Sequence, residues 1–360
     1  MKILYVITGL GQGGAERVVC ELADKMYEKG HEVKIAYLTG KVLTRPDHND
    51  IALIEVGLVN AFTLPKAYIK LSNIIREYQP DVVHAHMIHA NIFSRLIRAT
   101  TPIKKLICTA HSSNEGGILR MIAYRATDRL ADLTTNVSET AVTAYENKYA
   151  VPKNLMKKVY NGVNFNNFKY ESSAKLEIRD ELNLSAHKKI ILAVGRLNEA
   201  KNYPNLLRAI SYLKKITQVD FVLLVAGEGE LRNKIEELIC ELKLSNDVLL
   251  LGNRTDVTKL MSACDVFVLS SDYEGLPTVL IEALFCQANV VATEVSGVHE
   301  IVGTNGYIVP IKQPKVLAKF IANSLKNNKK NTSGYEYVNS KFNLDLIVNQ
   351  WTELYECNAL

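Results

Sequence analysis

The sequence predicts an α/β protein built from two doubly wound parallel-sheet domains. Short apolar runs of strand length alternate with stretches of helical periodicity, which is typical of strand–helix–strand units in a parallel sheet. The alternation starts at residue 2 and starts again near residue 188. A chain of 360 residues also exceeds one ordinary core, so two domains are expected.

The composition is that of a soluble globular protein. Apolar residues make up 48% of the chain and charged residues 22%, and no apolar run approaches the ~18–20 residues that span a bilayer. The first residues are typical of a strand followed by a glycine loop and a helix, and not of a signal peptide. The six scattered cysteines form no C-x-x-C pair, which favours a reduced, cytoplasmic protein.

The positive charge is concentrated in the amino-terminal half. Residues 1–168 carry 21 Lys and Arg against 15 Asp and Glu, whereas the remainder carries 22 against 23. A basic half can face an anionic lipid surface, nucleic acid or solvent, and no nucleic-acid motif accompanies it. Two basic, partly apolar segments, residues 92–98 and 118–129, are candidates for contact with an anionic membrane surface. The alternative is that both are helices packed on the sheet with charged outer faces.

A glycine-rich loop, Gly9-Leu-Gly11-Gln-Gly13-Gly14-Ala-Glu16, follows the first predicted strand, residues 2–7. The loop satisfies G-x-G-x-x-G, which on its own suggests a dinucleotide site. That interpretation requires a carboxylate after the second strand to bind the ribose. The second strand ends Leu-Thr-Gly-Lys, without a carboxylate, so an NAD enzyme is disfavoured.

Four histidines follow or end the inner strands of the first half. The further strands are predicted at 51–56, 81–86, 105–110 and 131–136. His111 comes directly after one of them, at the edge where open α/β sheets hold ligands. His84, His86 and His89 could suggest a metal site, but no carboxylate or cysteine joins them at ligand spacing. We interpret these three as structural histidines.

A strand, a polar loop and a helix make up residues 265–284, the most informative stretch of the chain. Glu274 lies on the loop, and Glu282 lies inside the helix, which starts near Pro277. Glu274 is therefore free to face a ligand, whereas Glu282 is fixed on a helix wall.

Two cations follow the first strand of the second half. This strand, residues 188–194, leads into a turn at Gly195 and then to Arg196 and Lys201. An Arg can bind two phosphate oxygens at once, and a Lys acts as a point charge. The turn therefore predicts a diphosphate site.

These motifs together resemble the retaining glycosyltransferases of group 1, whose GT-B architecture has two Rossmann-like domains facing a central cleft. The resemblance rests on four segments, Gly-Gly-Ala-Glu (13–16), Asn-Gly-Val-Asn (161–164), Gly-Arg-Leu…Lys-Asn (195–202) and Glu-Gly-Leu-Pro-Thr-Val-Leu-Ile-Glu (274–282). It implies an acceptor-side domain over 1–164 and a nucleotide-sugar-binding domain over 165–343, with a linker at 161–173. The last helix, within 344–360, is expected to cross back to the first domain.

The resemblance also implies a set of site residues. The catalytic residues would be Glu274, His111, Arg196 and Lys201. Donor binding would involve Gly13, Gly14, Gly195, Arg196, Lys201, Asn253, Glu274, Gly275, Leu276, Pro277, Thr278 and Glu282. In that scheme the two cations bind the diphosphate, Glu282 binds the ribose, and Glu274 and His111 bind the donor sugar. Glu230 stands where the family usually has proline and would touch no ligand.

The implied activity is transfer of a sugar from a nucleotide-sugar to a glycan hydroxyl, with retention at the anomeric carbon. No Asp-x-Asp occurs in the chain, so we predict no metal and no other cofactor, with the cations supplying the electrostatic stabilisation. The expected donor is UDP-hexose or UDP-N-acetylhexosamine. The expected acceptor is a lipid-linked glycan of bacterial O-antigen or capsule synthesis, met in the cytoplasm at the inner face of the membrane.

Three alternatives stay open. A retaining phosphorylase of the same architecture would need a cofactor-lysine segment, and none is recognisable. A carbohydrate- or nucleotide-binding protein with a weak, relic site would be expected to have lost Glu274, Arg196 or Lys201, and all three are present. An NAD enzyme lacks its ribose carboxylate.

Overall fold

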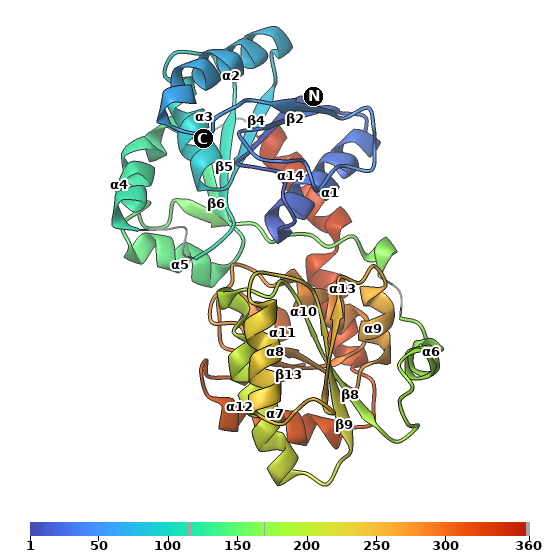
Figure 1. Ribbon diagram of the computed structural model, residues 1–360. Coiled ribbons are helices and arrows are strands. Elements are labelled where there is room, and N and C mark those ends of the chain that lie inside the picture. The colour runs from blue at the N-terminus through green and yellow to red at the C-terminus, as the bar shows by residue number, and fades with distance from the viewer. Residues whose placement is uncertain (114–116, 169, 358–360) are drawn as a thin grey trace. The chain divides into compact units, whose positions relative to one another are not determined.

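The computed structural model describes residues 1–113, 117–168 and 170–357 (Figure 1). Its internal contacts divide the chain into two units, the first made of residues 1–162 and 344–360 and the second of residues 163–343. One residue of the predicted linker, 169, and the last three of the predicted final segment, 358–360, lie outside the described residues.

The first unit contains, among its described residues, a seven-stranded sheet in the order β3-β2-β1-β4-β5-β6-β7. Every neighbouring pair is parallel. The strands are β1 (Lys2–Ile7), β2 (Glu32–Tyr37), β3 (Ala52–Glu55), β4 (Val82–His86), β5 (Leu106–Ala110), β6 (Leu133–Asn136) and β7 (Met156–Lys158). Because all strands run the same way, the loops that follow them gather at one edge, which is the ligand-binding edge of such sheets.

Helices cover both faces of this sheet, and its strands are therefore apolar on both sides. The helices are α1 (Gly14–Glu28), α2 (Leu64–Tyr78), α3 (Ile88–Arg98), α4 (Ile118–Thr127), α5 (Glu139–Asn147) and α14 (Leu344–Glu356), with 3₁₀ turns η1 (Ala61–Thr63) and η2 (Asp128–Leu130). Tyr5 of β1 faces the core shared with α1 and α14, whereas its neighbours Leu4 and Val6 face α2 and α3.

The C-terminal helix α14 belongs to the first unit. Its buried side chains, Leu344, Ile347, Val348, Trp351 and Tyr355, recur at helical spacing and join the core of α1 and β1. Fully burying one large apolar side chain contributes roughly 1.5–3 kcal/mol, so this face holds the helix on the sheet.

The second unit contains, among its described residues, a six-stranded parallel sheet in the order β10-β9-β8-β11-β12-β13. The strands are β8 (Lys189–Val194), β9 (Phe221–Ala226), β10 (Val248–Gly252), β11 (Val266–Leu269), β12 (Asn289–Thr293) and β13 (Gly306–Val309). The predicted fold class, two Rossmann-like sheets with the last helix returning to the first, is confirmed.

Helices α7, α8 and α12 share one core with this sheet, and α9 and α10 pack on β8 and β12. The helices of the unit are α6 (Ala174–Glu181), α7 (Tyr203–Ile216), α8 (Arg232–Glu241), α9 (Val257–Ala263), α10 (Thr278–Phe285), α11 (Val298–Val302), α12 (Pro314–Leu325) and α13 (Thr332–Phe342), with 3₁₀ turns η3 (Phe165–Asn167) and η4 (Glu199–Lys201). In the described part of the chain, no helix has the length and apolar character needed to cross a bilayer.

Candidate active site

Five loops gather at the carboxyl edge of the second sheet. They follow β8, β9, β10, β11 and β12, and together with helix α10 they contain every site residue that the sequence predicts for this half of the chain. The parallel sheet brings them to one edge although up to about 100 residues separate them along the chain.

Backbone-to-backbone contacts join the first three of these loops. Gly227 N donates to Gly252 O at 2.8 Å, and Leu197 N donates to Glu228 O at 2.9 Å. Gly227 has φ +144°, and a Cβ there would collide with the carbonyl oxygen of Gly195. Only glycine permits this approach, so the loops form a rigid floor of main-chain groups.

A salt bridge links the loops after β8 and β11. Lys201 Nζ lies 2.6 Å from Glu274 Oε1, and both side chains are largely withdrawn from solvent. Ser271 Oγ donates to the same carboxylate oxygen at 2.7 Å. The sequence predicted a loop carboxylate free to face a ligand, and this is corrected: Glu274 is held between an ammonium and a hydroxyl because β8 and β11 are neighbours in the sheet.

The loop that carries Glu274 is fixed along its length. Asp272 N donates to Ala200 O at 2.8 Å, and Asn202 Nδ2 donates to Asp272 Oδ1 at 2.8 Å. On the other side Gly297, with φ +78°, packs so closely on Gly275 that a Cβ would lie 2.9 Å from its carbonyl oxygen. The carboxylate is therefore presented by a preformed loop.

Arg196 forms an ion pair that the sequence did not predict. Its Nε lies 3.1 Å from Glu230 Oε2, and the two side chains are 67% and 54% exposed. That Glu230 touches no ligand stays a prediction; its contact with Arg196 arises because the loop after β9 lies against the loop after β8. An exposed pair of this kind is worth only ~0–1 kcal/mol, so Arg196 can exchange Glu230 for a phosphate.

The other residues expected to bind the donor differ in exposure. Glu282 lies on α10 and is buried. Leu276 and Pro277 precede the helix and are also buried. Thr278 is the first residue of α10. Asn253, directly after β10, is exposed. The helix starts one residue later than Pro277, within the usual variation of helix boundaries.

In the first unit, Gly13 is the residue that precedes α1, and no side chain caps this helix. The first-turn carboxylate of Glu16 folds back beside Gly13, where a Cβ would collide with it. Burial raises the pKa of Glu16. The sequence assigned the backbone N–H groups of Gly13 and Gly14 to donor phosphates and missed that Glu16 shares the same space. Its helical position, three residues after the glycine, could have indicated this.

His111 follows β5 and contacts His86, the last residue of β4. His86 Nδ1 and His111 Nε2 are 3.0 Å apart. Burial lowers the pKa of His86 well below its ordinary value and lowers the pKa of His111 to about 4. His84, also neutral, joins a separate set of hydroxyl partners, Thr109 at 2.7 Å and Tyr355 at 2.6 Å.

The described residues hold no group of three or more His, Cys, Asp or Glu side chains arranged to bind a metal ion. The three inner histidines differ instead in their partners and exposure. His84 and His86 are buried, and His89 is exposed on α3. Their interpretation as structural histidines therefore needs revision for His86, which touches a candidate site residue.

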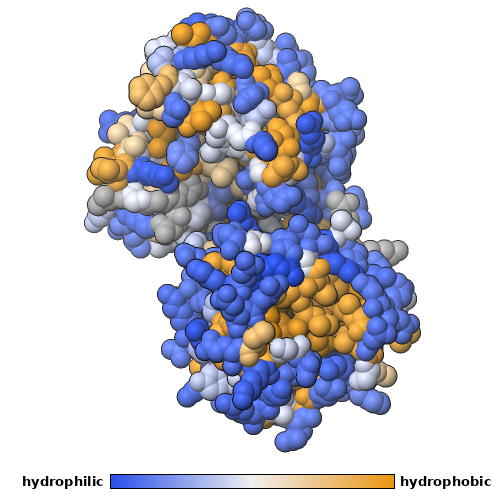
Figure 2. Space-filling view, viewed as in Figure 1, coloured by the Kyte–Doolittle hydropathy of each residue, from blue (hydrophilic) through white to orange (hydrophobic). Residues whose placement is uncertain are grey.

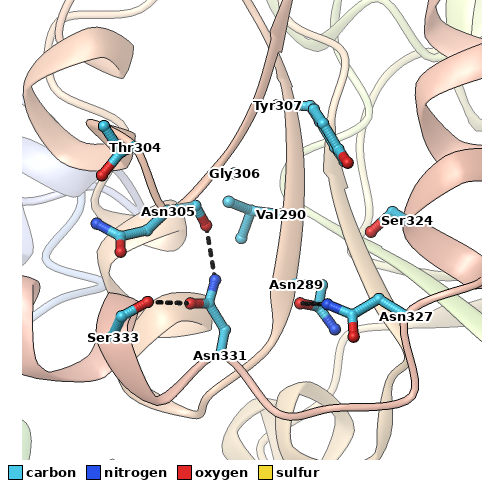
Figure 3. A pocket seen from close by; sticks show the side chains of 10 residues that line it. All are labelled: Asn289, Val290, Thr304, Asn305, Gly306, Tyr307, Ser324, Asn327, Asn331 and Ser333. Atoms are coloured by element: carbon cyan, nitrogen blue, oxygen red, sulfur yellow. Dashed lines mark hydrogen bonds between the residues drawn. The ribbon is translucent and has the colours of Figure 1, made fainter.

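A different hollow in the second unit lies at the opposite edge of its sheet (Figure 3). It measures about 270 Å³ and is lined by Asn289, Val290, Thr304, Asn305, Gly306, Tyr307, Ser324, Asn327, Asn331 and Ser333. Asn289 begins β12 and Gly306 begins β13, so this is the amino-terminal edge. No lining residue is a cation, and Asn331 Nδ2 is already bonded to Asn305 O at 2.7 Å. The hollow does not suit a diphosphate.

The arrangement agrees with the architecture that the resemblance implies. Two doubly wound sheets, with cations and a loop carboxylate at the carboxyl edge of the second, are expected of a GT-B glycosyltransferase. The profile of "Glycosyl transferases group 1" matches residues 174–340, and that of "Glycosyltransferase Family 4" matches residues 12–167. The chain is a glycosyltransferase and belongs to the group 1 family.

Curated relatives agree with this assignment, and a solved structure shares the fold. The chain is 27% identical over 345 residues to the N-acetylgalactosamine-N,N'-diacetylbacillosaminyl-diphospho-undecaprenol 4-alpha-N-acetylgalactosaminyltransferase of Campylobacter jejuni, covering 91% of each chain. It is 29% identical over 305 residues to the putative glycosyltransferase EpsF of Bacillus subtilis, covering 78% of this chain and 76% of that one. Among structures, Anabaena Alr3699/HepE in complex with UDP and glucose superposes with a TM-score of 0.82 at 21% identity, over 98% and 99% of the chains.

Proposed function

We propose that this glycosyltransferase moves a sugar from UDP-hexose or UDP-N-acetylhexosamine to a hydroxyl of a lipid-linked glycan, without a metal and with retention at the anomeric carbon. The observation that carries the proposal is the Lys201–Glu274 pair at 2.6 Å, set beside Arg196 on the carboxyl-edge loops. The names of the relatives support the acceptor class, since one acts on a diphospho-undecaprenol glycan.

The donor diphosphate is assigned to Arg196, Lys201 and the main-chain floor around Gly195. Arg196 can turn from Glu230 to fork two phosphate oxygens, and Lys201 supplies a second positive charge. Glu282 on α10 is assigned to the ribose hydroxyls, and Asn253 to the nucleobase. In the first unit, the N–H groups at Gly13 and Gly14 are assigned to phosphate oxygens, as at other helix N-termini that follow glycine loops.

The donor sugar is assigned to Glu274, with Gly275 to Thr278 lining the same loop. Glu274 accepts hydrogen bonds from sugar hydroxyls while Ser271 and Lys201 hold it in place. His111 is assigned to another sugar hydroxyl. Both are held by neighbours before the donor arrives, which is the arrangement that lowers the cost of binding a transition state.

The chemistry proceeds on one face of the sugar. The acceptor oxygen forms a bond to the anomeric carbon as the bond from that carbon to the phosphate oxygen breaks. The acceptor proton passes to the departing phosphate, whose charge Arg196 and Lys201 stabilise. No step uses a metal or a covalent enzyme intermediate.

The acceptor is assigned to a largely apolar pocket of about 320 Å³ in the first unit. Its lining follows the ends of β1, β2 and β3 and includes Thr8, Leu38, Thr39, Leu58 and Ala61. The Thr8 hydroxyl is buried and has no hydrogen-bond partner among the described residues. An apolar pocket with a few polar groups at the ligand-binding edge suits the non-ionic sugar or acetamido groups of a glycan.

Membrane contact is proposed for α4 alone. The first basic segment of the sequence is excluded, because Arg95 is fully buried, 3.0 Å from Asp128, and Arg98 pairs with Asp132. On α4, in contrast, Leu119 and Ile122 are 78% and 58% exposed, and hydrophobic surface is visible in that region of the first unit (Figure 2). The exposed apolar face of α4 supports a proposed position at the inner face of the membrane, where the enzyme would build a surface polysaccharide such as O-antigen or capsule.

Donor hydrolysis tests the proposal. A panel of UDP- and GDP-sugars is incubated with the protein without acceptor or metal, with Glu274→Ala in parallel. Slow release of one nucleotide that survives EDTA and disappears in the variant is the expected result. If no nucleotide is released from any donor, and UDP and GDP do not raise the melting temperature, a weak carbohydrate- or nucleotide-binding protein would be favoured instead.

The acceptor pocket is tested separately with Ala61→Trp. Ala61 is exposed at the pocket rim, so the larger side chain fills the pocket without entering the core. Transfer to a lipid-linked glycan should fall by at least about tenfold while donor hydrolysis is retained, since only acceptor binding is blocked. Equal loss of both activities would place the acceptor elsewhere.

A further inference from the structure

His86 and His111 form a hydrogen-bonded pair that the proposed mechanism uses only in part. His86 ends β4, and His111 follows β5, its neighbour in the sheet. Their ring centroids are 5.3 Å apart, and Nδ1 of His86 lies 3.0 Å from Nε2 of His111. His86 is 1% exposed, so it meets a ligand only through its partner.

The pair sits against a buried set of rings that fixes His86 on its other side. The His84 ring lies 3.9 Å from the His86 ring, and Tyr5 lies 5.7 Å away. His84 is itself held by Thr109 and by Tyr355 of α14. The His86 ring therefore cannot swing away from His111 without disturbing the sheet and the last helix.

The backbone next to His86 is also unusual. Met87 has φ +72° and ψ 154°, a conformation that residues with a Cβ rarely adopt. Such a strained conformation persists only where surrounding contacts impose it. Here Met87 N donates to Thr109 O at 3.0 Å, which holds the turn that ends at His86.

The protonation of the pair follows from what surrounds it. Both imidazoles are neutral near pH 7, because burial lowers their pKa, so each carries one N–H and a single proton lies between them. Whichever ring donates that proton, the accepting ring carries its own proton on its other nitrogen. The shared hydrogen bond therefore links the orientation of each ring to the nitrogen that is protonated in the other.

We propose that His86 is a positioning residue for His111: the hydrogen bond between His86 Nδ1 and His111 Nε2 fixes the orientation and the tautomer of the His111 ring. This rests on the proposed function, in which His111 meets a hydroxyl of the donor sugar. A neutral imidazole held in one tautomer suits a hydroxyl and leaves the charges at the diphosphate undisturbed.

The experiment combines kinetics with nitrogen NMR on the full-length protein. In wild-type protein labelled with ¹⁵N-histidine, and with His111 assigned by His111→Asn, long-range ¹H–¹⁵N spectra should show His111 in a single tautomer. His86→Ala should lower kcat about 10- to 100-fold, with little change in donor KM, and should shift the His111 tautomer signals. His86→Asn, whose amide can donate from nearly the same place as Nδ1, should recover most of the rate.

Tyr355→Phe is the matched control. It removes a hydroxyl from the same buried set of rings. The Tyr355 hydroxyl bonds to His84 and to the Tyr5 hydroxyl. It should lower stability and leave both kcat and the His111 signals unchanged. Equal effects of Tyr355→Phe and His86→Ala, or a wild-type rate and unchanged signals in His86→Ala, would overturn the positioning role.

The two proposals fail in different ways. If wild-type protein turns over no nucleotide-sugar, the proposed function falls, and the NMR measurement alone then decides how His86 and His111 share their proton. Two exchanging tautomers of His111 in active wild-type enzyme would overturn the inference and leave the transferase activity intact.

Discussion

Lys201 Nζ and Glu274 Oε1 lie 2.6 Å apart, although 73 positions separate the two residues along the chain. The pair joins the residue assigned to the donor diphosphate to the residue assigned to the donor sugar. Neither side chain can move without changing the charge that the other one faces. In a partly buried position, removal of one partner leaves the other uncompensated.

We therefore expect Lys201 and Glu274 to act as a unit. Lys201→Ala and Glu274→Gln should each lower turnover by about 10²-fold or more, because each removes a group and also releases its partner. The double variant should be little worse than the more damaged single variant, as is usual for residues that act together. Steady-state kinetics with the donor found in the hydrolysis panel measures this.

The control for this comparison of single and double variants is Lys214→Ala. Lys214 also forms a 2.7 Å pair, with Asp247, but its side chain is more exposed and it lies on α7 away from the carboxyl-edge loops. Its loss should leave turnover unchanged. Fully additive effects of Lys201→Ala and Glu274→Gln would show that the contact is incidental.

Substitutions of Arg196 and Glu230 should change turnover and UDP binding but leave the stability of the fold nearly unchanged. Their ion pair is exposed, so breaking it should change the free energy of unfolding by less than about 1 kcal/mol. Arg196→Ala should nevertheless reduce kcat by about 10²- to 10³-fold, since it removes a donor to the leaving phosphate. Glu230→Gln frees the guanidinium and should tighten UDP binding, as measured by calorimetry. A near-normal rate for Arg196→Ala would end its assigned role.

The first unit should lose stability as the pH falls below 7. Burial lowers the pKa of His84, His86 and His111, the last to about 4. Near pH 6.5 these groups bind protons in the unfolded chain but not in the folded one. Each therefore contributes stability that is present above pH 6.5 and is lost at up to ~1.4 kcal/mol per pH unit as the pH falls towards the folded pKa.

Trp351 provides the measurement. It is the single tryptophan of the chain, is buried in the first unit, and has its ring 4.5 Å from that of His84. Urea unfolding followed by its fluorescence, between pH 7.5 and 5.5, should show the decline, and His86→Asn should make the slope shallower by about one proton. Tyr355→Phe, which removes no titrating imidazole, should keep the slope. Burial raises the pKa of Glu16 and of Asp24, which acts with the opposite sign, so the slopes of the variants are compared with that of the wild type.

The fold could be predicted largely from the sequence, because it depends on local patterns. Apolar runs of strand length and helical spacing fix the order of elements, and a parallel sheet then places every strand-end loop at one edge. That is enough to gather Gly195, Arg196, Lys201 and Glu274 in one region. It also explains why the amphipathic face of residues 347–355 identified the last helix.

The contacts inside the site could not be predicted in the same way. The pairing of Arg196 with Glu230, and of Lys201 with Glu274, depends on which strands are neighbours and on loops that pack by main-chain contact. His86 looked like any strand histidine until β5 placed His111 beside it. Likewise Arg95 seemed to belong to a basic surface, and its burial against Asp128 follows from a turn 33 residues away.

The exposed face of α4 leads to the last prediction, which concerns the membrane. Leu119 and Ile122 are three residues apart, so they share one face of the helix, and Arg125 continues it; the exposed Arg129 follows in η2. Each cation near an anionic surface contributes about 1 kcal/mol at physiological ionic strength, and the apolar side chains add burial in the headgroup region. Wild-type protein should therefore sediment with anionic vesicles at low salt and be released as salt screens the charges.

Arg125→Ala with Arg129→Ala should weaken that binding by about 10- to 30-fold, given ~1 kcal/mol for each charge, and Leu119→Ser with Ile122→Ser should weaken it at every salt concentration. Leu176→Ser is the matched control, because Leu176 is 67% exposed on α6 of the second unit and has no proposed contact with lipid. Donor hydrolysis should be unchanged in all of these variants, since none touches the carboxyl-edge loops. If wild-type protein stays in the supernatant with anionic vesicles at low salt, α4 is an ordinary surface helix and the enzyme meets its acceptor without help from the lipid surface.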